Sequence, residues 1–246
     1  MSPSSQSPKV RLYIDADLVS GAELAPRDDQ AHYLRRVMRL GDGDAVAVFN
    51  GRDGEWRATL SVRGKRSAVL RVETCLRGQT PDPDIWLAFA PVKRPHIDFL
   101  VEKACELGVA RLAPVMTRFT MADRVNLDRL RANAVEAAGQ SRRLAVPGIA
   151  DPVSFDAFVA GLGPDRRLYW GDETGGGVPL ANAITGHEER PAIVFVGPEG
   201  GFCDAERTRL GALENARAVS LGPRILRADT AALVLLAQWQ TLAGDL

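Results

Sequence analysis

Residues 192–201, AIVFVGPEGG, decide the fold: an apolar run passes directly into a loop with three glycines and a proline. The run is short, wholly apolar and rich in β-branched residues, which predicts a strand buried on both faces of a parallel sheet. Ligands bind to such sheets in the loops that leave the carboxyl ends of the strands. Because glycine has no Cβ, the 197–201 loop lets backbone groups approach a ligand closely. We therefore expect a binding site there.

A second loop of the same kind follows the next predicted strand. It reads LGPRILR over residues 221–227 and runs directly into an apolar helix. Neither loop has the GxxxxGK[ST] phosphate-binding pattern, or GxGxxG with an acidic residue about 20 positions later, which disfavours a nucleoside triphosphate. GPEGG alone would be equally compatible with a tight strand-to-helix turn. A second Gly-Pro loop after the following strand weakens that alternative.

Strands and helices alternate on both sides of these loops, from residue 81 to the C-terminus. This pattern predicts an α/β domain with a parallel sheet covered by helices. The expected strands are residues 85–90, 110–115, 168–170, 192–196 and 218–221, and the expected helices begin near Pro95, Asn126, Asp204 and Asp229 or Thr230. The last helix is apolar nearly all round, so it has to be covered on every side by its own domain or by a second subunit.

The N-terminal part has a different pattern, with short apolar runs over residues 10–14, 45–49, 56–62 and 68–72. Turn sequences such as Asn50-Gly51 separate the runs, which predicts a β-meander or small barrel. One helix is expected over residues 28–40. The polar stretch RGQTPDPD over residues 77–84 is typical of a linker. We therefore place one domain over residues 1–80 and a second over residues 81–246.

The formal net charge of zero hides a difference between these two parts. Residues 1–80 hold 13 basic and 10 acidic side chains, whereas residues 81–246 hold 18 basic and 21 acidic ones. If Ala31, Leu34, Val37 and Met38 form the apolar stripe of the 28–40 helix, then His32, Arg35, Arg36 and Arg39 share the opposite face. A solvated helix face is the ordinary interpretation of such a charge run. Residues 32–39 contain no acidic residue, which leads us to predict contact with an RNA backbone.

Several classes of protein are excluded or disfavoured by the sequence. The longest wholly apolar stretch, residues 231–237, is far shorter than the roughly 18 residues that cross a bilayer. Residues 1–8 contain no apolar segment that would direct export. The three cysteines are far apart and lack CxxC spacing, and the three histidines are also distant from one another. We therefore expect a cytoplasmic protein with no membrane span, no disulfide framework and no metal site.

Longer motifs give a resemblance that covers nearly the whole chain. They are GPEGG at 197–201, LGPRILR at 221–227 followed by DTAAL at 229–233, EKACELGV at 102–109, EAAGQS at 136–141 and RVMR at 36–39. Together these motifs resemble the ribosomal small subunit methyltransferase E family, whose members methylate N3 of a uridine in 16S rRNA. GPEGG alone would not be specific for that family.

The resemblance implies a fold and a set of partners. Residues 1–80 would form a PUA-like β-barrel that binds RNA, and residues 81–246 a SPOUT domain, a parallel sheet whose last segment is threaded into a deep trefoil knot. Nothing in the composition indicates a knot. The family resemblance also implies S-adenosylmethionine (SAM) as methyl donor without a metal, a homodimer whose active site draws on both subunits, and 16S rRNA, within the small ribosomal subunit or its precursor, as substrate.

The resemblance also implies which residues of this sequence contact the cofactor and the RNA. Those expected at the cofactor are Trp170, Glu173, Gly197, Pro198, Glu199, Gly200, Gly201, Leu221, Gly222, Ile225, Leu226 and Arg227, and those added to the RNA contacts are Arg142 and Arg143. The departures from the family pattern are Ala145, where many members have a second Arg, Asp229, where many have Glu, and residues 93–96 (KRPH), where a glycine more often follows the Lys. These departures leave open which Arg meets the RNA.

Methylation of N3 requires that the uracil imide lose its proton. A nearby guanidinium can stabilise the resulting anion, but an arginine cannot act as the base. Arg224 and Arg227 are the first catalytic candidates, followed by Arg143. The alternative for Arg224 and Arg227 is an ion pair that holds their loop. Glu199 is a candidate base, although accepting hydrogen bonds within its loop is the favoured role.

We therefore expect a SAM-dependent rRNA (uridine-N3) methyltransferase. Two alternatives stay open: another knotted RNA methyltransferase that acts on a ribose 2′-OH or a different base, and a non-catalytic rRNA-binding assembly factor with the same fold. The sequence does not identify the group that deprotonates N3.

Overall fold

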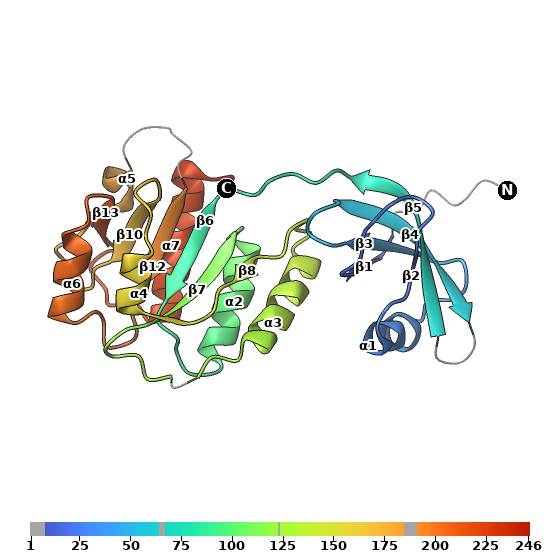
Figure 1. Cartoon of the computed structure of the whole chain (residues 1–246), viewed down its shortest axis with the longest axis horizontal. Coiled ribbons are helices and arrows are strands. Elements are labelled where there is room, and N and C mark those ends of the chain that lie inside the picture. The colour runs from blue at the N-terminus through green and yellow to red at the C-terminus, as the bar shows by residue number, and fades with distance from the viewer. Residues whose placement is uncertain (1–7, 64–66, 123, 185–190) are drawn as a thin grey trace. The chain divides into compact units, whose positions relative to one another are not determined.

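The computed structural model describes residues 8–63, 67–122, 124–184 and 191–246 (Figure 1). The chain folds into two compact units. Unit 1 comprises residues 1–81 together with residues 138–146, and unit 2 comprises residues 82–137 and 147–246.

Unit 1 is built on a five-stranded sheet with the order β1-β3-β4-β5-β2. The strands are β1 (Val10–Tyr13), β2 (Glu23–Leu24), β3 (Ala45–Phe49), β4 (Glu55–Arg63) and β5 (Ser67–Arg77). β1 pairs in parallel with β3, and the other pairs are antiparallel. Alternating residues of these strands point inward, so Val46, Val48, Leu60 and Leu70 are fully buried in one core. The meander predicted from the turn sequences is present.

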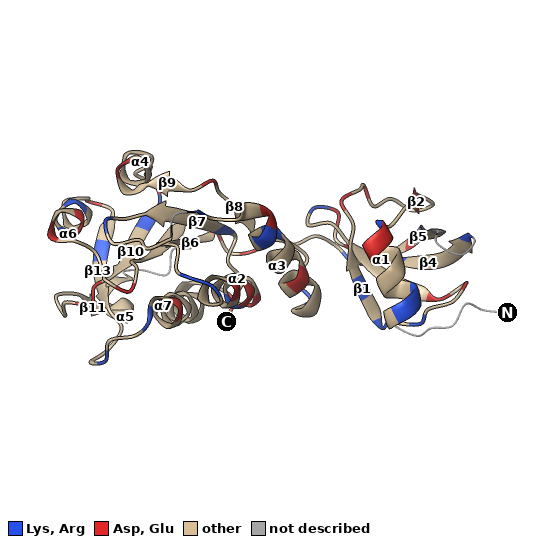
Figure 2. Cartoon of the chain, turned by 90° about the horizontal axis from the view of Figure 1, so that it is seen from below, with Lys and Arg blue, Asp and Glu red and all other residues tan. Residues whose placement is uncertain are grey.

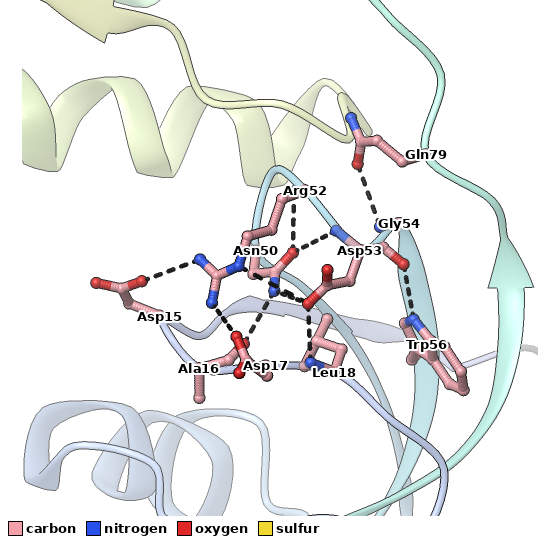
Figure 3. A network of polar contacts seen from close by, with 10 residues as sticks. All are labelled: Asp15, Ala16, Asp17, Leu18, Asn50, Arg52, Asp53, Gly54, Trp56 and Gln79. Carbon is pink, nitrogen blue, oxygen red and sulfur yellow. Dashed lines mark hydrogen bonds and ion pairs between the residues drawn. The ribbon is translucent and has the colours of Figure 1, made fainter.

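The turn between β3 and β4 is held by side chains (Figure 3). Asn50 Oδ1 accepts hydrogen bonds from the backbone N–H groups of Arg52 (3.0 Å) and Asp53 (2.8 Å), and its amide donates to the carbonyl of Ala16 at 2.9 Å. Asp53 accepts from the N–H of Leu18 at 3.0 Å. The Asn-Gly turn is therefore fixed to the 15–18 loop as well as to its own strands.

The helix predicted over residues 28–40 takes a different form. α1 (Asp28–His32) continues as a π-helix, η1 (Tyr33–Val37), and the chain then leaves the helix through Arg39 at φ +57°. A π-helix inserts extra residues into each turn, so the expected i, i+3, i+4 spacing is lost after Leu34. Leu34 is fully buried, whereas Val37 is 60% exposed. The prediction that Val37 and Met38 continue the apolar stripe is therefore wrong.

Residues 138–146 are fixed to the sheet of unit 1 by two arginines. The Arg11 guanidinium donates to the carbonyls of Ala138, Gly139 and Arg143, and it lies over the ring of Phe49 with 3.7 Å from Cζ to the ring centroid. Arg77 donates to the carbonyl of Arg142 at 2.9 Å.

Glu55 pairs with both Arg11 and Arg77, and only 12% of its side chain is exposed. Burial acts to raise the pKa of Glu55, but the hydrogen bonds from Arg77 and Arg11 outweigh it and leave the pKa below its ordinary value. A carboxyl group with a depressed pKa stabilises the fold above its unfolded-state pKa, and this stabilisation is lost as the pH falls through the folded-state pKa.

We expect Glu55→Gln to lower the free energy of unfolding by about 2 kcal/mol at pH 7, because Arg11 keeps its charge but loses its partner. The difference in free energy of unfolding between the variant and the unsubstituted protein should shrink as the pH falls below the pKa of a glutamate in the unfolded state, about 4.3. Urea denaturation across this pH range measures both effects. The matched control is Glu23→Gln, because the Glu23 side chain is 56% exposed in its pair with Arg63. The account of Glu55 is wrong if both variants lose equally little stability.

Unit 2 is an α/β structure with an eight-stranded sheet. Its central order is β11-β13-β10-β12-β6-β7-β8, with β9 paired to β7, and every pair in it is parallel. The strands are β6 (Ile85–Phe89), β7 (Arg111–Met116), β8 (Gly148–Ile149), β9 (Val153–Ser154), β10 (Arg167–Gly171), β11 (Val178–Pro179), β12 (Ala192–Val196) and β13 (Ala216–Ser220). β12 is buried at every position, as its wholly apolar sequence predicts.

Helices cover both faces of this sheet (Figure 2). The helices are α2 (His96–Glu106), α3 (Leu127–Gln140), α4 (Phe155–Ala160), α5 (Leu180–Ala183), α6 (Asp204–Gly211) and α7 (Ala228–Ala243). α4 and α6 lie on one face, and α2, α5 and α7 lie on the other. The short helices α4 and α5 are not predicted from the sequence. In the described residues, no helix has the length and apolar character that crossing a membrane requires.

The sequence predicts Asp204 as the N-cap of α6 and Asp229 or Thr230 as the N-cap of α7, and the structure corrects both. α6 begins after Cys203, whose N–H donates to Glu206 Oε2 at 2.9 Å, so Asp204 is the first helical residue. α7 begins after Arg227, so Asp229 and Thr230 lie in its first turn.

Candidate active site

Three loops of unit 2 meet at one cavity. They follow β10, β12 and β13, and because β10 lies between β12 and β13 in a parallel sheet, their carboxyl ends are adjacent. The cavity has a volume of about 240 Å³. Its lining residues fall in the ranges 171–175, 196–201 and 220–226, with Ala228 and Ala231 from α7. A site at the carboxyl ends of these strands is where a parallel sheet binds ligands.

The 197–201 loop needs its last glycine for conformational reasons. Gly201 has φ +69°, and its N–H donates to the carbonyl of Pro198 at 2.9 Å, which closes a tight turn. A Cβ on Gly201 would lie 2.7 Å from Cδ of Glu173, a residue of the neighbouring loop. The missing side chain therefore lets the two loops approach each other.

Acidic groups dominate the charge around the cavity. Among the described residues that line it, Asp172, Glu173 and Glu199 are acidic and only Arg224 is basic. Glu173 is held by Arg207 of α6, with 3.4 Å between Oε1 and Nη1. A lining that is acidic on balance, with free backbone groups supplied by glycine loops, fits a ligand that carries positive charge.

Comparison with known proteins decides the family. A model of the RNA methyltransferase domain matches residues 79–240, and a model of the RNA methyltransferase PUA domain matches residues 26–73. The ribosomal RNA small subunit methyltransferase E of Rickettsia conorii is 30% identical over 95% of this chain and 96% of its own length. This chain belongs to the ribosomal RNA small subunit methyltransferase E family.

Other members of the methyltransferase E family agree in sequence and fold. The enzyme of Synechocystis is 33% identical over 94% of this chain and 77% of its own length. A crystal structure of the methyltransferase E from Neisseria gonorrhoeae bound to S-adenosyl methionine superimposes with a TM-score of 0.85 at 27% identity, covering 96% of this chain and 98% of that one. The predicted PUA-like domain and the predicted α/β methyltransferase domain with a parallel sheet are confirmed, whereas the knot stays a prediction.

The structure brings most of the predicted cofactor residues of this methyltransferase E chain to the cavity. Those that line it are Glu173, Gly197, Pro198, Glu199, Gly201, Leu221, Gly222, Ile225 and Leu226. In the loop after β10, the sequence predicts the turn from Trp170 to Glu173 but not Thr174 and Gly175, which also line the cavity. The glycine run at 175–177 was the signal that could have identified this loop.

Three predicted cofactor residues do not line the cavity. Trp170 is buried, and its ring packs edge-on against Phe202 in the core. A Cβ on Gly200 would point at Phe119, 3.2 Å from its Cβ. Arg227 is the residue that precedes α7. Contacts of these three residues with a cofactor stay predictions.

The catalytic candidates belong to different units. Arg224 lines the cavity and is exposed, whereas Arg143 belongs to unit 1. Among the residues that the structure describes, no carboxylate forms an ion pair with Arg224. The alternative that Arg224 is held by a salt bridge therefore gains no support, and Arg224 is the leading candidate.

Asp229, which stands where many family members have Glu, pairs with a histidine. Its Oδ2 lies 2.8 Å from Nδ1 of His96 on α2, and the Asp229 side chain is largely buried. Burial acts to raise the pKa of Asp229, but the hydrogen bonds from His96 and from Thr230 outweigh it and leave the pKa below its ordinary value. The pair fixes the first turn of α7, directly after the loop that carries Arg224.

The predicted RNA-contacting residues all belong to unit 1. His32 on α1, Arg36 on η1 and Arg39 after η1 are exposed, and Arg35 is half-buried. Arg142 is exposed with φ +60°, and Arg143 is half-buried. The arginines around η1 therefore remain accessible, although the change to a π-helix rearranges the single face that the sequence predicts.

We expect the double substitution of Arg36 and Arg39 by Ala to flatten the salt dependence of RNA binding. Each lost phosphate contact removes about 0.7 to 0.9 from the slope of log K against log salt, so the slope should fall by about 1.5. The affinity for SAM should not change, because both residues lie in unit 1. Titration of the RNA substrate at several salt concentrations measures this slope. An unchanged slope would refute a phosphate-contacting role for these arginines.

The described residues contain no group of three or more His, Cys, Asp or Glu side chains placed to hold a metal ion.

Proposed function

We propose that this chain transfers the methyl group of SAM to N3 of a uridine in small-subunit rRNA, giving 3-methyluridine and S-adenosylhomocysteine. The observation that carries the proposal is the meeting of the 197–201 and 221–226 loops at one cavity beside an exposed arginine. Membership of the methyltransferase E family and the SAM-bound relative from Neisseria gonorrhoeae support it.

The cavity suits SAM in its chemistry. SAM carries a positively charged sulfonium and an adenosine, which require negative charge nearby and backbone hydrogen-bonding groups. Asp172, Glu173 and Glu199 supply the carboxylates, and the two glycine loops supply accessible N–H and carbonyl groups. Bound SAM supplies an electrophilic methyl group and leaves as a neutral thioether, so the residues of the chain need no metal to stabilise the leaving group.

The remaining task of the chain is to hold a uracil whose N3 has lost its proton. The negative charge of that anion spreads over N3 and the two carbonyl oxygens. Arg224 lies at the cavity, and its guanidinium can donate hydrogen bonds to an oxygen of the anion. We assign Arg224 this role, with Arg227 and Arg143 as further candidates.

The proposal includes an assembly and a location. We infer a homodimer because α7 is apolar nearly all round, and a second subunit would cover the side chains of its partly exposed face. The substrate is 16S rRNA within the small ribosomal subunit or its precursor, which places the enzyme in the cytoplasm. We also propose that the chain after β13 is threaded as a deep trefoil knot, as the family resemblance implies.

Methyl transfer in vitro tests this function. The purified protein is incubated with methyl-labelled SAM and with small subunits, large subunits or free 16S rRNA that lack the modification. The expected product is 3-methyluridine in the small-subunit rRNA alone. Label on a ribose 2′-OH or on another base would support a different RNA methyltransferase. A protein that shows no SAM binding by calorimetry would be an assembly factor and not an enzyme.

A further inference from the structure

An aromatic side chain is exposed close to the 197–201 loop. Phe119, in the segment after β7, is 45% exposed, whereas Phe195 and Phe202 of the same unit are buried. An exposed aromatic ring contributes less to the stability of the fold than a buried one. An exposed ring points to a function where the local structure prevents it from folding inward.

The segment that carries Phe119 is held in place on both sides. The N–H of Thr117 donates to Thr120 Oγ1 at 2.9 Å, and the N–H of Thr120 donates to the carbonyl of Thr117 at 3.2 Å. The N–H of Arg118 donates to Oε1 of Glu206 at 2.8 Å. Glu206 is itself 6% exposed, and its other oxygen caps α6. The turn is therefore anchored to the helix that follows the glycine loop, and it presents the ring outward.

The ring rests against the cavity-forming loop. The position that a Cβ of Gly200 would take is 3.2 Å from Cβ and 3.5 Å from Cγ of Phe119. The residues on either side of Gly200, Glu199 and Gly201, both line the cavity. Gly200 thus has no side chain at the point where Phe119 packs, and this contact places the ring beside the loop that would hold the cofactor.

We propose that Phe119 is the platform on which the target uracil stacks. This inference rests on the proposed function. N3 lies on the edge of uracil that pairs in a duplex, so the base has to leave a pairing partner before methylation. Proteins that recognise unstacked RNA bases place them on aromatic rings. A ring fixed next to the cofactor loop would replace the stacking that the base loses and would hold its N3 edge toward the cavity.

Substitutions of Phe119 separate stacking from packing. Phe119→Leu keeps an apolar contact with Gly200 but removes the aromatic face, and Phe119→Ala removes both. Loss of one stacked base corresponds to about a 10- to 100-fold fall in kcat/KM for unmodified small subunits. We expect this fall in both variants, with the SAM dissociation constant unchanged by calorimetry. Phe119→Tyr keeps an aromatic ring and should therefore keep most of the kcat/KM of the unsubstituted protein.

The control is Met121→Ala in the same segment, where the side chain is 66% exposed. It should keep the kcat/KM of the unsubstituted protein. The proposal is overturned if Phe119→Leu is as active as the unsubstituted protein, or if the Phe119 variants lose SAM affinity in proportion to activity. Formation of 3-methyluridine by the unsubstituted protein is measured in parallel. Its absence would contradict the proposed function itself, whereas its presence with a fully active Phe119→Leu would contradict only the stacking role.

Discussion

Gly201→Val is expected to raise the dissociation constant for SAM by about 100-fold or more. Gly201 has φ +69°, a conformation that a β-branched residue adopts only with strain. A Cβ at this position would also overlap the carboxylate of Glu173, which lines the cavity and is held by Arg207. The loop has to change its backbone conformation or expel Glu173, and either change removes groups that face the ligand.

Calorimetric titration with SAM measures this effect, and circular dichroism checks that the variant is folded. The matched control is Gly211→Ala, because a Cβ on Gly211 meets no atom within 4 Å and its φ is not positive. Gly211 is the last residue of α6, the helix that follows the 197–201 loop. A folded Gly201→Val that binds SAM normally would show that the cavity is not the cofactor site.

Arg224→Ala is expected to lower kcat about 100-fold with little change in SAM affinity. Removal of one hydrogen-bond donor to a developing anion commonly costs 10²- to 10³-fold in kcat, that is about 2.7 to 4 kcal/mol of transition-state stabilisation. Arg224 contributes its exposed side chain to the cavity edge. Its guanidinium would strengthen its contact only when the uracil loses its N3 proton, so the loss should fall on kcat and not on substrate binding.

Single-turnover kinetics with small subunits measures the chemical step directly. Arg224→Lys should restore part of the activity because it keeps the charge without the planar guanidinium. Arg227→Ala is the informative comparison, since Arg227 precedes α7 and does not line the cavity. If Arg227→Ala loses far more activity than Arg224→Ala, then Arg227 and not Arg224 stabilises the uracil anion, and our assignment is wrong.

The sequence predicts the parts of the site that depend on local pattern. A wholly apolar strand such as β12 has to be central in a parallel sheet, and the loop that follows it is then at the ligand-binding edge. The 221–227 loop follows the same logic after β13. The third loop, after β10, is predicted only as the turn from Trp170 to Glu173. The further cavity-lining residues Thr174 and Gly175 have the composition of an ordinary polar turn.

Other features depend on contacts that no local pattern reveals. The phase of a helix cannot be extrapolated through a π-helix, so the exposure of Val37 and Met38 was not predictable from spacing. Residues 138–146 belong to unit 1 because Arg11 and Arg77 bind their main-chain carbonyls, and a carbonyl has the same chemistry at every residue. In the same way, the sequence alone predicts that Gly200 contacts a ligand, whereas in the structure a Cβ on Gly200 would meet Phe119.

The most direct test of the central claim is mass spectrometry of nucleosides from small-subunit rRNA. The rRNA is taken from a strain that lacks this protein, from the parent strain, and from the deletion strain that expresses the protein or its Arg224→Ala variant. Our account predicts that 3-methyluridine is lost on deletion, returns with the unsubstituted protein and returns weakly or not at all with Arg224→Ala. Unchanged 3-methyluridine in the deletion strain, or the loss of a different methylated nucleoside, would contradict it.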